Sequence, residues 1–254
     1  MFLILVSLRK VKLMIREFLN STLKSRGLHI TPINEYEEQV EKVKDVWLQK
    51  MQISTILDIG ASDGGFARKA RKMFPNAHIY SFEPLPASFA KLNAHFEGDK
   101  KFTSFHFVLS NQEGEITFYQ SSRSGSSSLL EMGDLHKESY PESAQLTELK
   151  VKSYTLDAVI GSGQINYASE VLMKLDVQGA ESLVLEGAKE ALKRTKIVFT
   201  EMSFTELYKG QVTANAMISL LDSHGFQLCG IENVSRNVQD GSFLQCDAYF
   251  LRKE

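Results

Sequence analysis

The stretch from Ile53 to Phe66, ISTILDIGASDGGF, constrains the fold of this chain more than any other segment. A short apolar run leads into a glycine-rich turn, which predicts an internal strand of a parallel sheet followed by a helix. Gly60, Gly64 and Gly65 allow the backbone to approach a ligand where a Cβ atom would clash. Because open α/β sheets bind ligands at the carboxyl ends of their strands, we expect a ligand site at this turn.

The spacing and charge of the turn indicate the class of ligand. The glycines follow the pattern G-x-x-x-G-G, which differs from the G-x-G-x-x-G of dinucleotide-binding turns. Asp58 and Asp63 place negative charge where a pyrophosphate would lie, whereas such charge suits the amine and sulfonium of S-adenosylmethionine. The turn therefore favours S-adenosylmethionine, with the alternative that the glycines only tighten a strand–helix junction.

A carboxylate after the next strand supports the first interpretation. The stretch from His78 to Glu83, HIYSFE, is predicted to be a strand, and Glu83 is followed by Pro84. In nucleotide-binding α/β proteins an acid at this distance from the glycine turn accepts hydrogen bonds from the ribose hydroxyls. The order of strand, glycine turn, helix, strand and acid predicts a site for an adenosine.

Length and composition favour one globular enzyme domain. With 254 residues, of which 43% are hydrophobic, the chain is expected to form an α/β domain at 35–254 behind an extension at 1–34. A formal net charge of -2 gives no overall basic field, which disfavours nucleic acid as a partner. Cys229 and Cys246 lack a C-x-x-C arrangement and lie in apolar segments, which predicts buried thiols in a reducing cytoplasm.

The first residues, MFLILVSL, are apolar and precede a cluster of basic residues. The run is too short to span a bilayer, which takes about 20 residues, and its basic residues follow it, unlike those of a secretory signal. Two interpretations stay open: a segment that docks on the domain, or a weak peripheral association with anionic lipid. The basic residues are Arg9, Lys10, Lys12, Arg16, Lys24 and Arg26.

Apolar periodicity and turn residues predict the remaining elements. The serine-rich stretch at 121–128 is either a lid beside the site or a linker. The last two strands are expected to pair antiparallel, and Ser110 or Asn111, after the third parallel strand, is expected beside adenine. Helices are predicted at 35–49, 66–74, 84–96, 156–160, 180–192 and 213–224, and further strands at 102–109, 116–119, 149–155, 172–175, 197–202, 226–231 and 242–251.

Two strands end in carboxylates that are candidates for catalysis. The strand in VLMKLDVQG places Lys174 and Asp176 at its carboxyl end, and the strand in IVFTEM ends near Glu201. Charge at such buried positions is costly unless it is paired or used. Asp176, Gln178 and Glu201 also offer oxygen ligands for Mg²⁺, but without histidine or cysteine spacing the sequence predicts no metal site.

These segments together resemble the FkbM-type methyltransferases, a branch of the S-adenosylmethionine-dependent enzymes. The resemblance implies a Rossmann-like class I methyltransferase fold: a mostly parallel seven-stranded sheet with an antiparallel final hairpin and helices on both faces. Of the matching segments, KLDVQGAE is the most specific. They are LDIGASDGGF (57–66), FEPLPASFAKLNAH (82–95), VLSNQEGEITF (108–118), GSSSLL (125–130), YTLDAV (154–159), LMKLDVQGAESLVLEGA (172–188) and FTEMSFTELYKG (199–210).

The resemblance also implies roles for single residues and a reaction. Glu83, followed by Pro84, would bind the ribose, and Ser110 and Asn111 would lie near adenine. Ser62 stands where the family often has Asn, which affects the hydrogen bonds of the turn. Methyl transfer to oxygen is implied, commonly to a hydroxyl of a sugar, a glycan or a natural-product-like small molecule. The residues expected to hold the methionine part are Asp58, Gly60, Ala61, Ser62, Asp63, Gly64 and Phe66.

We expect Asp176 to orient or deprotonate the acceptor, with Glu201 as a further contact and Lys174 paired with either carboxylate. The alternative is that Lys174 and Asp176 only fix the strand end. His136 is a possible base, although a lone loop histidine is more often solvated. Three other functions compete: a nucleic-acid methyltransferase, a nicotinamide-dependent oxidoreductase and a non-catalytic binding module. The first lacks an Asn-Pro-Pro-Tyr loop, and the second is disfavoured by the glycine spacing and Asp63.

Overall fold

The computed structural model describes residues 14–30, 43, 45–166 and 170–254. Contacts divide the chain into two compact units, Met1–Met51 and Gln52–Glu254, whereas the boundary predicted at 34/35 lies outside the described residues and stays a prediction. The apolar MFLILVSL and most of the helix predicted at 35–49 also lie outside them. The first unit contains a helix at 14–23, η1 (Lys24–Arg26) and α3 (Val46–Gln49).

No helix in the described ranges has the length and apolarity needed to cross a bilayer.

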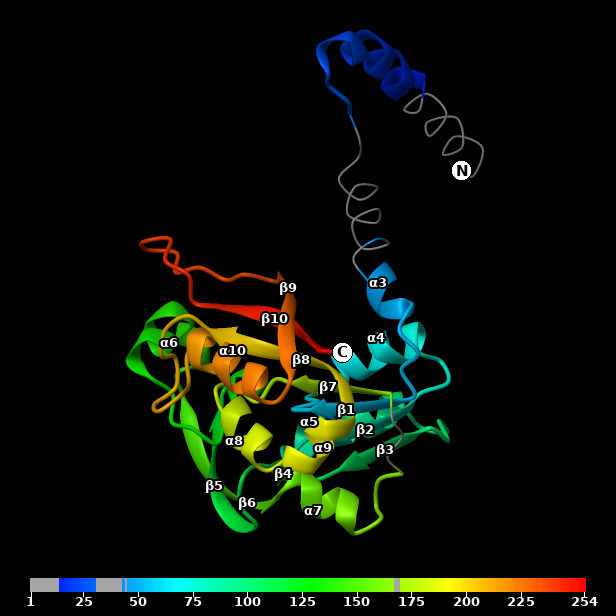
Figure 1. Ribbon diagram of the computed structural model, residues 1–254. Coiled ribbons are helices and arrows are strands. Elements are labelled where there is room, and N and C mark those ends of the chain that lie inside the picture. Colours follow the sequence, from blue (N-terminus) through cyan, green and yellow to red (C-terminus); the bar gives the residue numbers. More distant parts are fainter. Residues whose placement is uncertain (1–13, 31–42, 44, 167–169) are drawn as a thin grey trace, which may run out of the picture. The chain divides into compact units, whose positions relative to one another are not determined.

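A seven-stranded sheet forms the centre of the second unit, as counted over the described residues (Figure 1). Its order is β3-β2-β1-β7-β8-β10-β9; the first five strands are parallel, and β10 runs antiparallel to both of its neighbours. The predicted parallel sheet with a final antiparallel hairpin is therefore confirmed. The strands are β1 (Thr55–Ile59), β2 (His78–Phe82), β3 (Phe102–Phe105), β7 (Val171–Leu175), β8 (Thr195–Ser203), β9 (Phe226–Glu232) and β10 (Gln245–Arg252).

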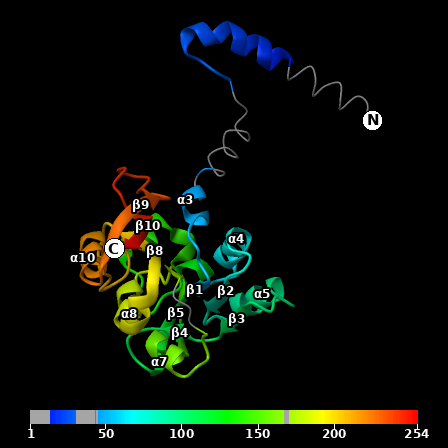
Figure 2. The ribbon, with the colours of Figure 1, turned by 45° about the vertical axis from the view of Figure 1, so that its right-hand side comes forward.

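Helices cover both faces of this sheet (Figure 2). Every residue of β1 and β7 is buried, as expected for central strands between two helical layers. On one face Leu57 and Met173 pack in a core with residues of α7 to α10, while α4 and α5 cover the other face. The helices are α4 (Gly65–Met73), α5 (Pro86–His95), α7 (Leu156–Gly161), α8 (Glu181–Glu186), α9 (Lys189–Arg194) and α10 (Ala214–Ser223).

The prediction of one long strand at 102–109 is wrong, because this segment is divided between the central sheet and a second, three-stranded sheet. The strand ends at Phe105, the last partner of β2, because β2 itself stops at Phe82 before Pro84 turns the chain away. After a bend, Val108 and Leu109 pair with another sheet of order β4-β6-β5. That sheet contains β4 (Val108–Leu109), β5 (Gly114–Ser121) and β6 (Leu146–Tyr154), and the connection between β5 and β6 contains α6 (Asp134–Ser139).

The helix predicted at 180–192 is also wrong in one respect, because it is broken into α8 and α9 at Gly187. A Cβ atom on Gly187 would lie 2.1 Å from the carbonyl oxygen of Ser110, which accounts for the glycine. The carbonyl of Gly187 accepts a hydrogen bond from the N–H of Asp157, in place of the N–H of Ala191 that a continuous helix would supply. The carboxylate of Asp157 accepts hydrogen bonds from the N–H groups of Glu190 and Ala191, which caps the second helix.

The two thiols differ in exposure. Cys246 is buried in the sheet, as predicted, but Cys229 is exposed because it lies on β9, the last strand of the sheet. The prediction that both thiols are buried is therefore wrong for Cys229, since an edge strand has a neighbour on one side only.

Candidate active site

The glycine turn is fixed by close approach of three strand ends. Gly60 has φ +78°, and a Cβ atom there would lie 1.9 Å from the main-chain oxygen of Asp176. The N–H groups of Gly60 and Ala61 donate to the carbonyl of Phe82, at 3.1 and 3.0 Å. Ser62 follows with φ 49°, a left-handed conformation that asparagine adopts more readily than serine. The turn therefore requires glycine at 60 for steric reasons.

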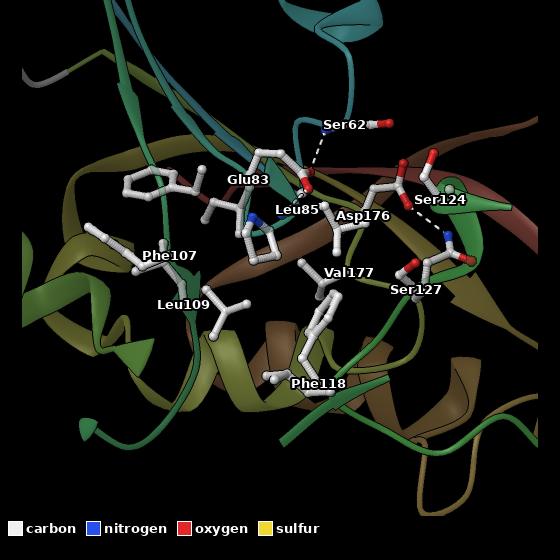
Figure 3. Close-up of a pocket in the computed structure, with 18 residues that line it drawn as sticks. Ser62, Glu83, Leu85, Phe107, Leu109, Phe118, Ser124, Ser127, Asp176 and Val177 are labelled. Carbon is white, nitrogen blue, oxygen red and sulfur yellow. Dashed lines mark hydrogen bonds between the residues drawn. The ribbon is translucent and has the colours of Figure 1, made fainter. Parts of the chain in front are cut away.

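Glu83 lies directly beside this turn, as Figure 3 shows. Its Oε2 accepts a hydrogen bond from the N–H of Ser62 and its Oε1 from the N–H of Leu85, each at 2.8 Å. Burial raises the pKa of Glu83 to about 6, although both hydrogen bonds oppose that shift. A carboxylate has further lone pairs, so Glu83 can still accept hydrogen bonds from a diol.

A cavity opens between the glycine turn, Glu83 and the three-stranded sheet (Figure 3). Its one end is apolar, with Phe107, Leu109 and Phe118, and its other end carries the carboxylates of Glu83 and Asp176. The apolar slot suits an adenine. The buried acid suits a ribose, and the acidic end suits a cationic tail. The full lining is Ile59, Gly60, Ser62, Phe82, Glu83, Pro84, Leu85, Phe107, Val108, Leu109, Phe118, Ser124, Gly125, Ser127, Leu129, Asp176, Val177 and Gln178.

The serine-rich stretch forms part of this cavity wall rather than a free linker. Ser124 and Ser127 line the cavity, and Ser127 Oγ accepts a hydrogen bond from the N–H of Ser121 at 3.0 Å. The hydroxyl of Tyr208 donates to the carbonyl of Ser126 at 3.1 Å. These contacts place the stretch beside the predicted adenosine site.

A second cavity, of about 260 Å³, adjoins the first at the glycine turn. The two cavities share Gly60, Ser62 and Asp176, so the side chain of Asp176 stands where they meet. Ala61, Asp63 and Phe66, which the resemblance assigns to the methionine part, line the second cavity and not the first, so that assignment stays a prediction. We call the first the cofactor cavity and the second, for the use proposed below, the acceptor cavity. The acceptor cavity is lined by Gly60, Ala61, Ser62, Asp63, Gly65, Phe66, Lys174, Leu175, Asp176, Phe199, Glu201 and Asp247.

Gln178 joins the two predicted catalytic carboxylates. Its Nε2 donates to Asp176 Oδ1 at 2.8 Å and to Glu201 Oε2 at 3.1 Å, while its Oε1 lies 3.0 Å from the hydroxyl of Tyr208. Glu201 also accepts from Gln245 Nε2 at 2.5 Å. Burial, and then the nearby charge of Asp176, raises the pKa of Glu201 well above its usual value. A carboxylate with a raised pKa is a stronger base than an ordinary one.

Lys174 is buried and forms an ion pair beneath the turn. Its Nζ lies 3.2 Å from Asp58 Oδ1 and 3.7 Å from Asp176 Oδ2, and it donates to the carbonyl of Gly60 at 2.6 Å. Burial alone would lower the pKa of Lys174, but Asp58 and Asp176 outweigh burial and raise it. Lys174 therefore remains a cation that holds the glycine turn. This arrangement favours the alternative in which Lys174 fixes the strand end over a role in proton transfer.

The loop after β7 is shaped by a buried glutamate that the predictions did not single out. Glu181 Oε1 accepts hydrogen bonds from the N–H groups of Val177 and Gly179, at 3.0 and 3.3 Å. Burial raises the pKa of Glu181 to about 7. The carboxyl fixes the turn in which Gln178 has φ 55°, and so it sets the position of the amide that joins Asp176 and Glu201.

Some predicted residues are not part of either cavity wall. Ser110 Oγ lies 2.8 Å from Ser153 Oγ, and Asn111 donates to Glu186. Neither residue lines the first cavity, whereas the adjoining residues 107–109 do, so a place for this pair beside adenine stays a prediction. Gly64 packs against Leu92 behind the turn, and Asp58 is fully buried under it.

His136 is buried rather than solvated. Its ring packs against Tyr140 and Tyr208, with centroids 5.0 and 4.9 Å apart, and neither ring nitrogen has a hydrogen-bond partner in the described structure. Burial lowers the pKa of His136 to about 4, which keeps the ring neutral. His136 is absent from both cavity walls, so it does not serve as the base.

Several site residues were not predicted because their sequence signal is that of a core. Phe118 and Phe199 lie in apolar runs, and Asp247 is one acid within the final strand. The register of β10 against β8 places Asp247 opposite Glu201, which only the sheet pairing reveals. Among the residues that the structure describes, no three His, Cys, Asp or Glu side chains form a metal-binding group.

Comparison with known proteins decides the family. The family model described as the methyltransferase FkbM domain matches residues 58–228. The chain belongs to the FkbM methyltransferase family. It is an S-adenosylmethionine-dependent methyltransferase, and both the cofactor and the fold implied by the sequence resemblance are confirmed.

One curated relative is also a methyltransferase. The chain is 32% identical over 174 residues to the 2-O-methyltransferase NoeI of Sinorhizobium fredii (strain NBRC 101917 / NGR234). The match covers 66% of this FkbM methyltransferase and 71% of the relative.

Two of the solved structures that the chain matches are methyltransferases of low sequence identity. A putative S-adenosylmethionine-dependent methyltransferase from Listeria monocytogenes has a TM-score of 0.48 at 10% identity, with 85% of this chain and 98% of that chain covered. Magnesium protoporphyrin IX methyltransferase from Synechocystis PCC 6803, with bound SAM, has a TM-score of 0.42 at 11% identity. The match covers 95% of this chain and 97% of that chain.

The raised pKa of Glu83 predicts how cofactor affinity depends on pH. Protonation removes an acceptor for the ribose hydroxyls, so affinity for S-adenosylhomocysteine should fall as the pH drops below about 6, by up to about tenfold per pH unit. Calorimetric titrations between pH 5 and pH 8 measure this. Glu83→Gln should bind weakly without that pH dependence, while the exposed Glu97→Gln should behave as wild type. An affinity in the wild type that is constant across this range would contradict the role of Glu83.

Proposed function

We propose that this methyltransferase transfers the methyl group of S-adenosylmethionine to a hydroxyl oxygen of a sugar, a glycan or a natural-product-like small molecule. The observation that carries the proposal is the position of Asp176 where the cofactor cavity meets the acceptor cavity. A carboxylate there can accept a hydrogen bond from a hydroxyl in the second cavity.

The proposed chemistry assigns separate tasks to the site residues. S-adenosylmethionine supplies an electrophilic methyl group on a sulfonium. Asp176 orients the acceptor hydroxyl and takes its proton, and Gln178 holds Asp176 and Glu201 in one arrangement. Alignment of the two reactants supplies much of the acceleration, and a positioned base contributes about 10²- to 10⁴-fold.

Two further observations support oxygen as the acceptor atom. The relative from Sinorhizobium fredii is a 2-O-methyltransferase, and its match covers 66% of this chain. The acceptor cavity contains carboxylates, which accept protons and hydrogen bonds from hydroxyls.

Binding and transfer are tested separately. Calorimetry with S-adenosylmethionine, S-adenosylhomocysteine and NADH should give heat for the first two ligands only. Labelled S-adenosylmethionine is then incubated with a panel of neutral, cationic and acidic oligosaccharides and small polyols, and label should enter a hydroxyl-bearing member as an ether. Transfer to nitrogen or carbon in place of oxygen would contradict the proposal.

Asp176→Asn separates catalysis from cofactor binding. The variant keeps the size of the side chain and the main-chain contact with Gly60, so affinity for S-adenosylhomocysteine should stay within about threefold of wild type. Turnover should fall by about 10²-fold because the base is lost. Asp222→Asn on α10, which removes an exposed carboxylate paired with Lys253, is the control. If cofactor affinity falls with turnover, Asp176 belongs to the cofactor site instead.

A further inference from the structure

We propose that the acceptor cavity selects a polyhydroxylated ring that is uncharged or positively charged and rejects sugars that carry a carboxylate or phosphate beside the reacting hydroxyl. The inference rests on the proposed function and names the class of acceptor. It is carried by three properties of the cavity wall: its charge, the direction of its hydrogen bonds and its aromatic side.

The first property is an excess of negative charge. Four carboxylates line the cavity, from Asp63, Asp176, Glu201 and Asp247, and in the described lining only Lys174 is cationic. Lys174 is committed to the fully buried Asp58 at 3.2 Å. Burial raises the pKa of Glu201 well above its usual value and also raises that of Asp247. Asp63 and Asp176 alone still outweigh the one net positive charge of S-adenosylmethionine, so the cavity remains formally negative when the cofactor is bound. An anionic acceptor would enter against this field.

The second property is that the charged side chains of the described lining offer more hydrogen-bond acceptors than free donors. Ionised carboxylates only accept hydrogen bonds, whereas the ammonium of Lys174 already donates to the carbonyl of Gly60 and contacts two carboxylates. A fitting ligand must therefore bring O–H or N–H groups. Sugar hydroxyls and protonated amines do so, but phosphate and carboxylate groups bring more acceptors. Charge and hydrogen bonding thus select against the same ligands.

The third property is an aromatic side next to these carboxylates. The rings of Phe66 and Phe199 are stacked, with centroids 5.9 Å apart and planes 19° apart, and both line the cavity. Tyr249 stacks behind Phe199 at 4.4 Å. Phe66 comes from α4 and Phe199 from β8, so this apolar side is built by two elements. It provides a surface for the C–H groups of a sugar ring, while the carboxylates take its hydroxyls.

The side-chain charge of Asp247 can be changed without touching the cofactor cavity. Asp247 lines only the acceptor cavity, and its Oδ2 accepts a hydrogen bond from Asn233 at 2.7 Å. Asp247→Asn thus removes one negative charge from the wall and keeps the shape. Asp134→Asn is the matched control, since the side chain of Asp134 is 90% exposed and belongs to neither cavity.

The test uses three β-1,4-linked tetrasaccharides with one backbone and three charges: glucosamine, glucose and glucuronic acid. Each is titrated calorimetrically into protein saturated with S-adenosylhomocysteine at low ionic strength. The glucosamine and glucose tetramers should bind at least about tenfold more tightly than the glucuronic acid tetramer. The ratio between these affinities should fall by about threefold or more in Asp247→Asn and in high salt. It should stay unchanged in Asp134→Asn.

Equal or tighter binding of the glucuronic acid tetramer would overturn the inference. So would the absence of binding by both other tetramers while the heat with S-adenosylhomocysteine is intact, or an equal response of the Asp247→Asn and Asp134→Asn variants. Absence of heat with S-adenosylhomocysteine itself would overturn the proposed function instead, and the first titration of the series therefore separates the two failures.

Discussion

Gly60→Ala should bind S-adenosylhomocysteine too weakly for calorimetry to detect, a loss of more than about 10³-fold in affinity. The reason is steric, because the added Cβ atom would lie 1.9 Å from the main-chain oxygen of Asp176. That oxygen belongs to a main chain that the hydrogen bond from the N–H of Asp176 to the carbonyl of Ile59 holds in place, so the turn must shift. The N–H groups that the turn donates to Phe82 then move, and Ser62 loses its hydrogen bond with Glu83. The ribose site and the methionine end are both distorted.

The control for this variant is a glycine with the same backbone angle and free space around it. Gly98 has φ +81°, and a Cβ atom added there would have no neighbouring atom within 4 Å, so Gly98→Ala tests the strain of a left-handed alanine alone. It should cost about 1 kcal/mol of stability and leave cofactor affinity unchanged. Normal binding by a folded Gly60→Ala variant, judged by circular dichroism, would refute the steric account of the turn.

Lys174→Met should lower the free energy of unfolding by about 3–5 kcal/mol, the usual cost of leaving a buried charge without its partner. Lys174 and Asp58 have side chains 5% and 0% exposed, and their charged atoms lie 3.2 Å apart. Methionine fills the space of the lysine stem but leaves Asp58 with only the hydroxyl of Ser81. The variant also loses the bond from Nζ to the carbonyl of Gly60, so cofactor affinity should fall as well.

A double variant identifies the cause of this loss. Lys174→Met combined with Asp58→Asn removes both charges and should regain more than half of the lost stability, measured by urea denaturation. Lys193→Met, at an exposed lysine paired with Glu190, is the control and should change stability by less than about 1 kcal/mol. A double variant no more stable than the single one would contradict an ion-pair origin.

The parts of the fold that local signals determine were predictable. The strands β1, β2, β7 and β8 are apolar runs that end at a glycine or a carboxylate, and their places in the sequence were predicted within a few residues. The split of 102–109 between two sheets was not predictable from that segment, because the length of β2 decides it. The break at Gly187 depends on Asp157, which is distant in sequence and forms hydrogen bonds with Gly187 and Ala191 in place of the helical one.

The same distinction applies to the candidate site. Glu83, Gly60 and Asp176 follow strands directly, so their sequence positions indicate where they lie. The sequence positions of the aromatic residues of both cavities do not indicate a site, since an apolar residue in a strand is usually part of a core. Ser110 and Asn111 were predicted beside adenine on the assumption that the third strand continues, but the strand ends at Phe105 and the pair bonds to Ser153 and Glu186, so that role stays a prediction.

Residues of β8 and β10 line only one of the two cavities, and this has a practical consequence for redesign. Phe199, Glu201 and Asp247, on β8 and β10, line the acceptor cavity and contribute nothing to the wall of the cofactor cavity. Glu201 also holds Gln178 of the cofactor cavity wall, so libraries randomised at Phe199 and Asp247 can explore new acceptors while the adenosine-binding half of the enzyme is preserved. An engineer could retune what is methylated and leave the methyl donor as it is.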